Sequence, residues 1–194
     1  MNSATLVGLF TVPILVTKLN YSDIESVEAI CKEEYNKDPE GSLKSNYGGW
    51  QSNNLQNCEL EVTLFPEIQN ICQQFAKDVL KFGKPVKMLN AWININDKNS
   101  SNVTHTHPHS ILSGVYYVKT PENSGNIKFF HPAIDMFERD WSDIQKLEPL
   151  EINSPAWWFT PEEGHMYLFP SWLKHNVLPN KSDDERISIS FNVA

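Results

Sequence analysis

Apolar residues recur at helical spacing in two segments of the first half of the chain. Over residues 22–35 they fall on one face, and Ser22 with Glu25 matches the capping box that begins many helices. A second segment, 66–82, starts at a proline, has a clearer apolar stripe and is ended by Gly83. The pattern therefore predicts two N-terminal helices.

Beyond residue 85 the pattern changes to alternation with a period of two, which is typical of β-strands rich in β-branched and aromatic residues. The expected strands are 86–96, 111–118, 126–130, 166–169 and 186–193. The apolar stretch 4–16 is expected to form a strand pair or a bent strand. The polar stretch 36–60 is long for a connection, so it is either a functional loop or partly structured.

Two helices followed by many short strands predict an α+β protein that is mainly β. The leading candidate is a double-stranded β-helix (jelly roll) with two supporting N-terminal helices. At 194 residues, the chain has the size of one domain. We expect residues 1–85 to supply helical support and N-terminal strands, and residues 86–194 to form the β core.

Charge and cysteine content narrow the function classes. The chain has 16 Lys and Arg against 24 Asp and Glu, a formal charge of −8, so it lacks a broad basic surface for bulk nucleic acid or anionic membrane. No apolar run reaches the ~18 residues of a membrane span. Three widely spaced cysteines argue against a disulfide framework and fit a reducing, cytoplasmic compartment; a homodimer stays open.

All six histidines lie within residues 105–175. His105 and His107 are two positions apart, so in an extended chain their side chains point the same way and can converge on one ion. Pro108 ends the strand there and turns His109 aside. The alternative is a polar turn whose histidines are merely exposed.

His175 provides a possible third ligand. It follows a tight turn that begins at Pro170 and opens the next strand, where a jelly roll returns to face its starting strand. A third imidazole there would complete a set on one side of an ion and leave the opposite positions open, as in non-haem Fe(II) oxygenases. A lone histidine at such a place can equally be structural.

Arg186 opens the last strand, with Ser188 on the same face. A guanidinium that points into a β core needs an anionic partner, because burying it unpaired is costly. That partner is either a nearby protein carboxylate, from Asp183 to Glu185, or the carboxylate of a ligand held bidentately. The sequence supports both equally.

Together these features resemble the 2-oxoglutarate/Fe(II)-dependent dioxygenases, most closely the small bacterial and phage oxygenases and more distantly the prolyl 4-hydroxylases. The likeness runs from about Asn90 to Asn192. It rests on Asn90-Ala91-Trp92, the His-x-His-Pro turn, residues 112–118, residues 168–173 with His175, and Arg186-Ile187-Ser188.

The resemblance implies a double-stranded β-helix that binds Fe(II) and 2-oxoglutarate. His105 matches the proximal metal ligand and His175 the distal one. Arg186 matches the residue that holds the far carboxylate of 2-oxoglutarate, and Ser188 and Tyr117 match positions that often assist it.

His107 departs from the family pattern, because the wider superfamily has Asp or Glu at this position. The implied catalytic and metal-binding set is His105, His107 and His175. Three neutral imidazoles leave the site one unit more positive than two histidines and a carboxylate would. Alternatively, one histidine of the pair is not a ligand, and Asp135 or Asp97 completes the site. His131 and His165 have no matched role and are assigned to the surface.

The implied activity is hydroxylation of a C–H bond of an amino acid, peptide or small metabolite, with O₂ consumed and succinate and CO₂ formed. Trp92, Tyr116 and Trp172 are candidates to line a dry cavity, although core packing explains them equally well.

Two other classes compete with this one. Gly164, Pro170 and His175 also approximate the second motif of cupins, which predicts a metalloenzyme that does not use 2-oxoglutarate. The second is a non-catalytic jelly-roll binding module. Arg186 separates them, since only the oxygenase requires its guanidinium to face the metal cavity.

Overall fold

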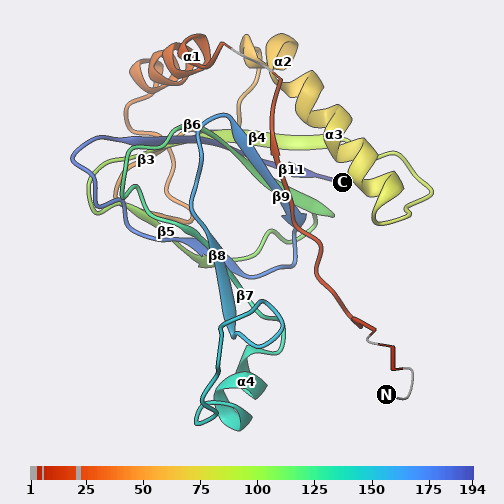
Figure 1. Cartoon of the computed structure of the whole chain (residues 1–194). Coiled ribbons are helices and arrows are strands. Elements are labelled where there is room, and N and C mark those ends of the chain that lie inside the picture. The colour runs from red at the N-terminus through yellow and green to blue at the C-terminus, as the bar shows by residue number, and fades with distance from the viewer. Residues whose placement is uncertain (1–3, 6, 21–22) are drawn as a thin grey trace.

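Two antiparallel β-sheets face each other in the computed structural model, which describes residues 4–5, 7–20 and 23–194 (Figure 1). The larger sheet has the order β1 (Leu15–Lys18), β9 (His165–Pro170), β6 (Leu112–Lys119), β11 (Arg186–Val193), β4 (Met88–Asn96) and β3 (Trp50–Gln51). The smaller has the order β2 (Asn46–Tyr47), β5 (Ser101–His105), β10 (His175–Val177), β7 (Ile127–Phe130) and β8 (Ala156–Phe159). The sheets do not close, and the predicted mainly-β jelly roll is confirmed.

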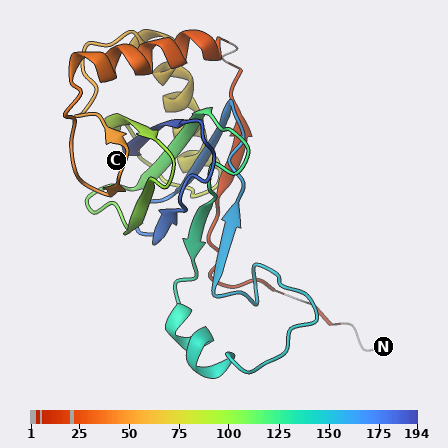
Figure 2. The ribbon, with the colours of Figure 1, turned by 90° about the vertical axis from the view of Figure 1, so that its left-hand side faces the viewer.

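Helices cover the outer face of the larger sheet (Figure 1). They are α1 (Ile24–Lys37), α2 (Leu60–Thr63) and α3 (Phe65–Asp78). Their apolar stripes, including Val27 and Ile68, pack on apolar side chains of the sheet in one continuous core. A fourth helix, α4 (Ile134–Asp140), lies in an excursion that projects away from the sheets (Figure 2).

The neighbouring strands β4 and β11 of the larger sheet each have one apolar and one polar face. Ile93 of β4 and Ile189 of β11 belong to the core beneath the helices. Their neighbours, Asn94 and Ser188, are buried on the opposite face, between the sheets, and lie directly across from each other. A polar stripe therefore runs through the interior of the sandwich, where a purely structural core would be apolar.

A second, smaller core fills the remaining space between the sheets. It is built mostly from aromatic side chains, and its members are Val115, Tyr117, Ile127, Phe129, Tyr167, Phe169 and Leu173. The edge-to-face contact of Phe129 with Phe169, with 4.9 Å between ring centroids, is typical of this packing. This cluster borders the polar stripe, so the site described below has one polar and one aromatic wall.

The structure corrects several local predictions. Helix α1 is capped by Asp23, whose carboxylate accepts the backbone N–H of Ser26, and the proposed cap Ser22 lies outside the described residues. Of the stretch 4–16, only its end enters β1, and residues 7–14 form neither helix nor strand. Helix α4 was not predicted, because its seven residues bury no side chain.

The long polar stretch 36–60 is partly structured, since it contains β2 and β3. The three cysteines are free, as their spacing predicted. None of the helices in the described part of the chain has the length and apolar character that crossing a bilayer requires.

Candidate metal centre and its cavities

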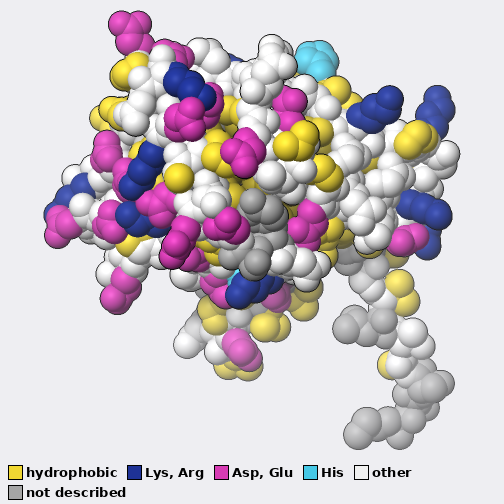
Figure 3. Space-filling model, turned by 90° about the horizontal axis from the view of Figure 1, so that it is seen from above, with side chains coloured by type: hydrophobic (Ala, Val, Ile, Leu, Met, Phe, Trp, Pro, Cys, Tyr) yellow, Lys and Arg dark blue, Asp and Glu magenta, His cyan; other side chains and the backbone are white. Residues whose placement is uncertain are grey.

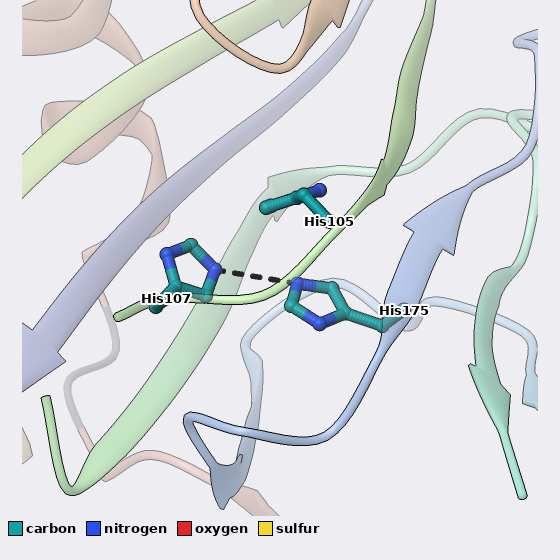
Figure 4. Close-up of side chains that lie close together, drawn as sticks. All are labelled: His105, His107 and His175. Carbon is teal, nitrogen blue, oxygen red and sulfur yellow. Dashed lines mark hydrogen bonds between the residues drawn. The ribbon is translucent and has the colours of Figure 1, made fainter. Parts of the chain in front are cut away.

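The side chains of His105, His107 and His175 meet between the two sheets (Figure 4). Their potential ligand nitrogens all lie within 4.8 Å of one another. His105 ends β5 and His175 begins β10, and the two are directly paired across these antiparallel strands. Strand pairing therefore brings together two histidines that lie far apart in the sequence.

His107 lies beyond the end of β5, and a backbone contact holds it in place. Its N–H donates to the carbonyl of Ser171 at 2.9 Å, which ties it to the turn that leads into β10. The imidazoles of His107 and His175 are stacked, with 5.1 Å between their centroids. The predicted convergence of the His-x-His pair with His175 is thus present in the structure.

Backbone carbonyls select the tautomer of two of these histidines. Nδ1–H of His105 donates to the carbonyl of Val103 at 2.7 Å, and Nδ1–H of His175 donates to that of Leu173 at 2.8 Å. A carbonyl can only accept, so the hydrogen is on Nδ1 and the Nε2 lone pair is free to bind a metal. Metal-binding histidines commonly have this outer hydrogen bond.

The spacing of the Nε2 atoms suits one ion. The Nε2 atoms of His107 and His175 are 3.3 Å apart and form a hydrogen bond, in which Nε2–H of His107 donates because Nε2 of His175 has only a lone pair (Figure 4). Two imidazole nitrogens that are each about 2.1 Å from a metal, at a right angle, are about 3 Å apart. The donor set would therefore fit a divalent metal ion, with the three imidazoles as its protein ligands.

Burial keeps these imidazoles neutral. Desolvation, together with the neighbouring His105, lowers the pKa of His107 to about 4 and that of His175 to about 3. Desolvation also lowers the pKa of His105, although its bond to Val103 opposes this. Neutral imidazole is the form that binds a metal, so the protein provides the three ligands already deprotonated at neutral pH.

These shifts give a pH prediction. Protons compete with the metal only below the pKa of each ligand, so three ordinary imidazoles, each with a pKa of ~6.5, would lose about three orders of magnitude in metal affinity by pH ~5.5. With lowered values, we expect the affinity for Zn(II) to fall less than about tenfold between pH ~7 and ~5.5. Titration with a chelator competitor at several pH values measures this, and the full thousandfold loss would contradict it.

No carboxylate joins the three imidazoles among the described residues. Asp97 lines a different cavity together with Trp50, and Asp135 lies in the first turn of α4. The structure therefore does not support the alternative in which either of them completes the metal site.

Arg186 is the other unusual group of this interior. Only 1% of its surface is exposed, and its Nη1 donates to the backbone carbonyls of Ser124, Gly125 and Leu178. Its Nε and Nη2 have no hydrogen-bond partner among the described residues. The residue lines the same cavity as the three histidines. Desolvation lowers the pKa of this guanidinium, as expected for a buried cation without a carboxylate.

The neighbouring protein carboxylates do not partner Arg186. Each is instead paired with a lysine, Asp183 with Lys98, Asp184 with Lys119 and Glu185 with Lys32. Two of the three guanidinium nitrogens, with three of its five N–H donors, are thus left to a group that the protein does not supply. This favours the second interpretation of Arg186, a ligand carboxylate.

Ser188 and Tyr117 lie across from each other on β11 and β6, and both line the cavity in front of Arg186. The hydroxyl of Tyr117 is buried and makes no hydrogen bond to a described residue. Desolvation raises its pKa, whereas the nearby Arg186 opposes this shift. A carboxylate bound by Arg186 would provide the acceptor that this hydroxyl lacks.

Two adjoining cavities meet at the histidines. The inner cavity extends from His105, His107 and His175 to Arg186. The outer cavity has a volume of about 640 Å³ and leads from the histidines past Gln51. The two share Ser45, Trp92, His105 and His107.

Of the three aromatic residues that were candidates to line the cavity, one does so. Trp92 lines both cavities, but Tyr116 belongs to the core beneath the helices and Trp172 is 57% exposed, so neither of these two lines the site. His109, in a left-handed turn with φ of 67°, lines the outer cavity.

The two unmatched histidines lie outside both cavities. Nδ1 of His131 accepts the backbone N–H of Ala133, and Nε2 of His165 is 3.7 Å from a carboxylate oxygen of Glu162.

Two polar residues of the site were not predicted from the sequence. Gln51 and Asn94 are cross-strand partners on β3 and β4, both are buried, and the side-chain carbonyl of each has no hydrogen-bond partner among the described residues. The alternation of Asn90, Trp92, Asn94 and Asn96 along one face of a buried strand was the available signal. A polar face in the interior of a β-sandwich marks a binding surface.

Known proteins with similar structures share this architecture. A prolyl 4-hydroxylase from Pseudomonas putida matches with a TM-score of 0.67 and 13% identity, over 95% of this chain and 94% of that one. HygX from Streptomyces hygroscopicus, solved with nickel, 2-oxoglutarate and hygromycin B, matches with a TM-score of 0.66 and 10% identity, over 95% and 83%. At such identities these likenesses show the fold alone.

The carbocyclase SnoK of nogalamycin biosynthesis, described as non-haem and α-ketoglutarate-dependent, matches with a TM-score of 0.65 and 15% identity, over 93% of this chain and 78% of that one. No curated protein is similar enough to count as a relative. A family model described as "Putative 2OG-Fe(II) oxygenase" matches residues 90–192, which is more than half of the chain and includes the histidines and Arg186. The chain belongs to this family of 2OG-Fe(II) oxygenases, whose cofactors are Fe(II) and 2-oxoglutarate.

Proposed function

We propose that this oxygenase is a hydroxylase, in which His105, His107 and His175 bind the iron and Arg186 binds the far carboxylate of 2-oxoglutarate. One observation supports this above all. The buried Arg186 has two unpartnered nitrogens and lines the same cavity as three converging imidazoles. A cupin without 2-oxoglutarate, or a simple binding module, has no need for that arrangement.

Each residue has a defined role under this proposal. With both cofactors bound, the site would use O₂ to convert 2-oxoglutarate to succinate and CO₂ and to place the other oxygen atom on a substrate C–H. The three neutral imidazoles would hold the metal. Arg186, assisted by Ser188 and the Tyr117 hydroxyl, fixes the orientation of the cosubstrate.

The aromatic wall has a separate part in this scheme. Phe169 lines the inner cavity and packs against His175 at 4.7 Å between ring centroids. Apolar side chains at this place exclude water from the reacting atoms. They also lower the local dielectric, which strengthens the hold of Arg186 on a carboxylate.

We further propose that the substrate is an amino acid, a peptide or a small metabolite that enters through the outer cavity. Its volume of about 640 Å³ is within the range of small-molecule sites. The core beneath the helices is continuous from α1 to β11, which supports treating the chain as a single domain with helical support and a β core.

Spectroscopy without oxygen tests the cofactor assignment. Addition of Fe(II) and 2-oxoglutarate to the metal-free protein is expected to produce the visible charge-transfer band of a chelated keto acid. Removing Fe(II) or replacing 2-oxoglutarate by succinate should abolish it. Metal binding without this band would support the cupin interpretation. Binding of neither metal nor 2-oxoglutarate would support the non-catalytic binding module.

A further inference from the structure

The two cavities lack acidic side chains, although the chain as a whole is acidic. Among the described residues that line them, none is Asp or Glu. The charged side chains are Arg186 in the inner cavity and Lys44 at the outer one. Elsewhere Asp and Glu are spread over the surface, as on the helix-covered face seen from above (Figure 3). The site is thus a positive region of a protein with a net charge of −8.

His107 makes this region more positive than a related site with a carboxylate ligand. Three neutral imidazoles leave both charges of a divalent metal uncompensated, and Arg186 adds a third. The two carboxylates of 2-oxoglutarate cancel two of these charges. One positive charge therefore remains in a partly desolvated cavity, where an uncompensated charge is unfavourable.

Nearby carboxylates cannot supply the missing negative charge. Asp183, Asp184 and Glu185 precede Arg186 directly, but each forms an ion pair with a lysine. Neither Asp97 nor Asp135 lines the inner or the outer cavity. The compensating anion must therefore come from outside the protein.

The outer cavity has groups that suit such an anion. Lys44 offers a positive charge at its wall. Gln51 lines this cavity with only 1% of its surface exposed, and its buried side-chain carbonyl has no partner among the described residues, so a ligand N–H or O–H that reaches it would complete its hydrogen bonding. A molecule with both a negative charge and a hydrogen-bond donor would satisfy both residues.

We propose that the primary substrate of this oxygenase is an anion, with the chemistry of an acylated amino acid or a similar carboxylate that has an N–H donor. Its negative charge takes the place of the charge that a carboxylate ligand at position 107 would provide, and its N–H group donates to the side-chain carbonyl of Gln51. The inference depends on the proposed function, because the excess charge arises only when metal and cosubstrate are bound.

Binding measurements with two matched probes test this without any turnover. The protein is loaded with Zn(II) and the inert cosubstrate analogue N-oxalylglycine, then titrated calorimetrically with N-acetylglycine or with its neutral carboxamide. The two probes share the N–H donor and differ by one charge. We expect the anion to bind at least about tenfold more tightly, a preference that weakens as salt is added.

Variants identify the source of the preference. His107→Asp keeps a metal ligand and restores the negative charge, so it should reduce the preference for the anion about tenfold. Lys44→Gln should reduce it by a smaller factor. Lys98→Gln removes a lysine that pairs with Asp183 outside both cavities, and it should leave the preference unchanged.

The two hypotheses fail in different ways. If N-oxalylglycine does not bind the Zn(II)-loaded protein, the proposed function is wrong. If the analogue binds but the anion has no advantage over the carboxamide, or the anion fails to bind at tens of millimolar, the inference is wrong. An equal preference in the His107→Asp variant, with zinc content confirmed, would also overturn it.

Discussion

Replacing His175 by alanine is expected to abolish metal binding and turnover together. His175 is the most buried of the three histidines, and its Nε2 lies 3.3 Å from that of His107. Its loss leaves two candidate ligands, and one of them, His107, lies beyond the end of β5. Removing even an outer hydrogen-bond partner of a metal ligand costs about 10- to 100-fold in affinity, so losing the ligand itself should cost more than about 100-fold.

Zinc titration and succinate formation measure the two effects of this change. His175→Gln keeps most of the side-chain volume, so it separates loss of a ligand from loss of packing. His165→Ala is the matched control, because His165 lies outside both cavities. Full metal affinity in a folded His175→Ala protein would remove His175 from the ligand set.

The second large effect is expected at Arg186. Arg186→Gln should weaken 2-oxoglutarate binding about a hundredfold or more while the affinity for metal changes little. Truncating one partner of a buried, hydrogen-bonded charge pair typically costs about 2–5 kcal/mol. Because two nitrogens of Arg186 have no partner among the described residues, the proposed charge pair would form only when the cosubstrate binds.

Two further variants complete this test. Arg186→Lys keeps the charge but not the bidentate geometry, so its affinity should lie between those of the wild type and Arg186→Gln. Arg139→Gln changes an exposed arginine of α4 that pairs with Asp140, and it should leave cosubstrate binding unchanged. Circular dichroism checks that each variant is folded, since Nη1 of Arg186 also bonds three backbone carbonyls. Unchanged 2-oxoglutarate affinity in folded Arg186→Gln would refute the assignment.

Much of the β core could be predicted from the sequence, because a strand with one buried face has a period of two. The predicted strand 186–193 agrees with β11, and 86–96 contains β4. Short helices and strands were harder to predict. Strand β8 and helix α4 have four and seven residues, and so few positions give no reliable periodicity.

The candidate ligands could also be proposed from the sequence, since His-x-His spacing and a histidine after a turn are local features. What the sequence left open was which side chains face them. It allowed Asp97 or Asp135 to complete the metal site in place of one histidine of the pair, and it allowed a carboxylate of Asp183 to Glu185 as the partner of Arg186. Only the structure shows that the first two lie outside both cavities and that the last three are paired with lysines.

The sequence by itself determined the strand faces, the candidate ligands and the resemblance to the family, because these depend on local periodicity and short motifs. The tertiary structure alone decided that β5 pairs with β10, which places His105 opposite His175. It also decided that Gln51 and Arg186 have unpartnered polar atoms beside the cavities. The reason is physical: strand pairing and the satisfaction of buried polar groups depend on residues far apart in the chain, and their contacts exist only once the whole core has packed.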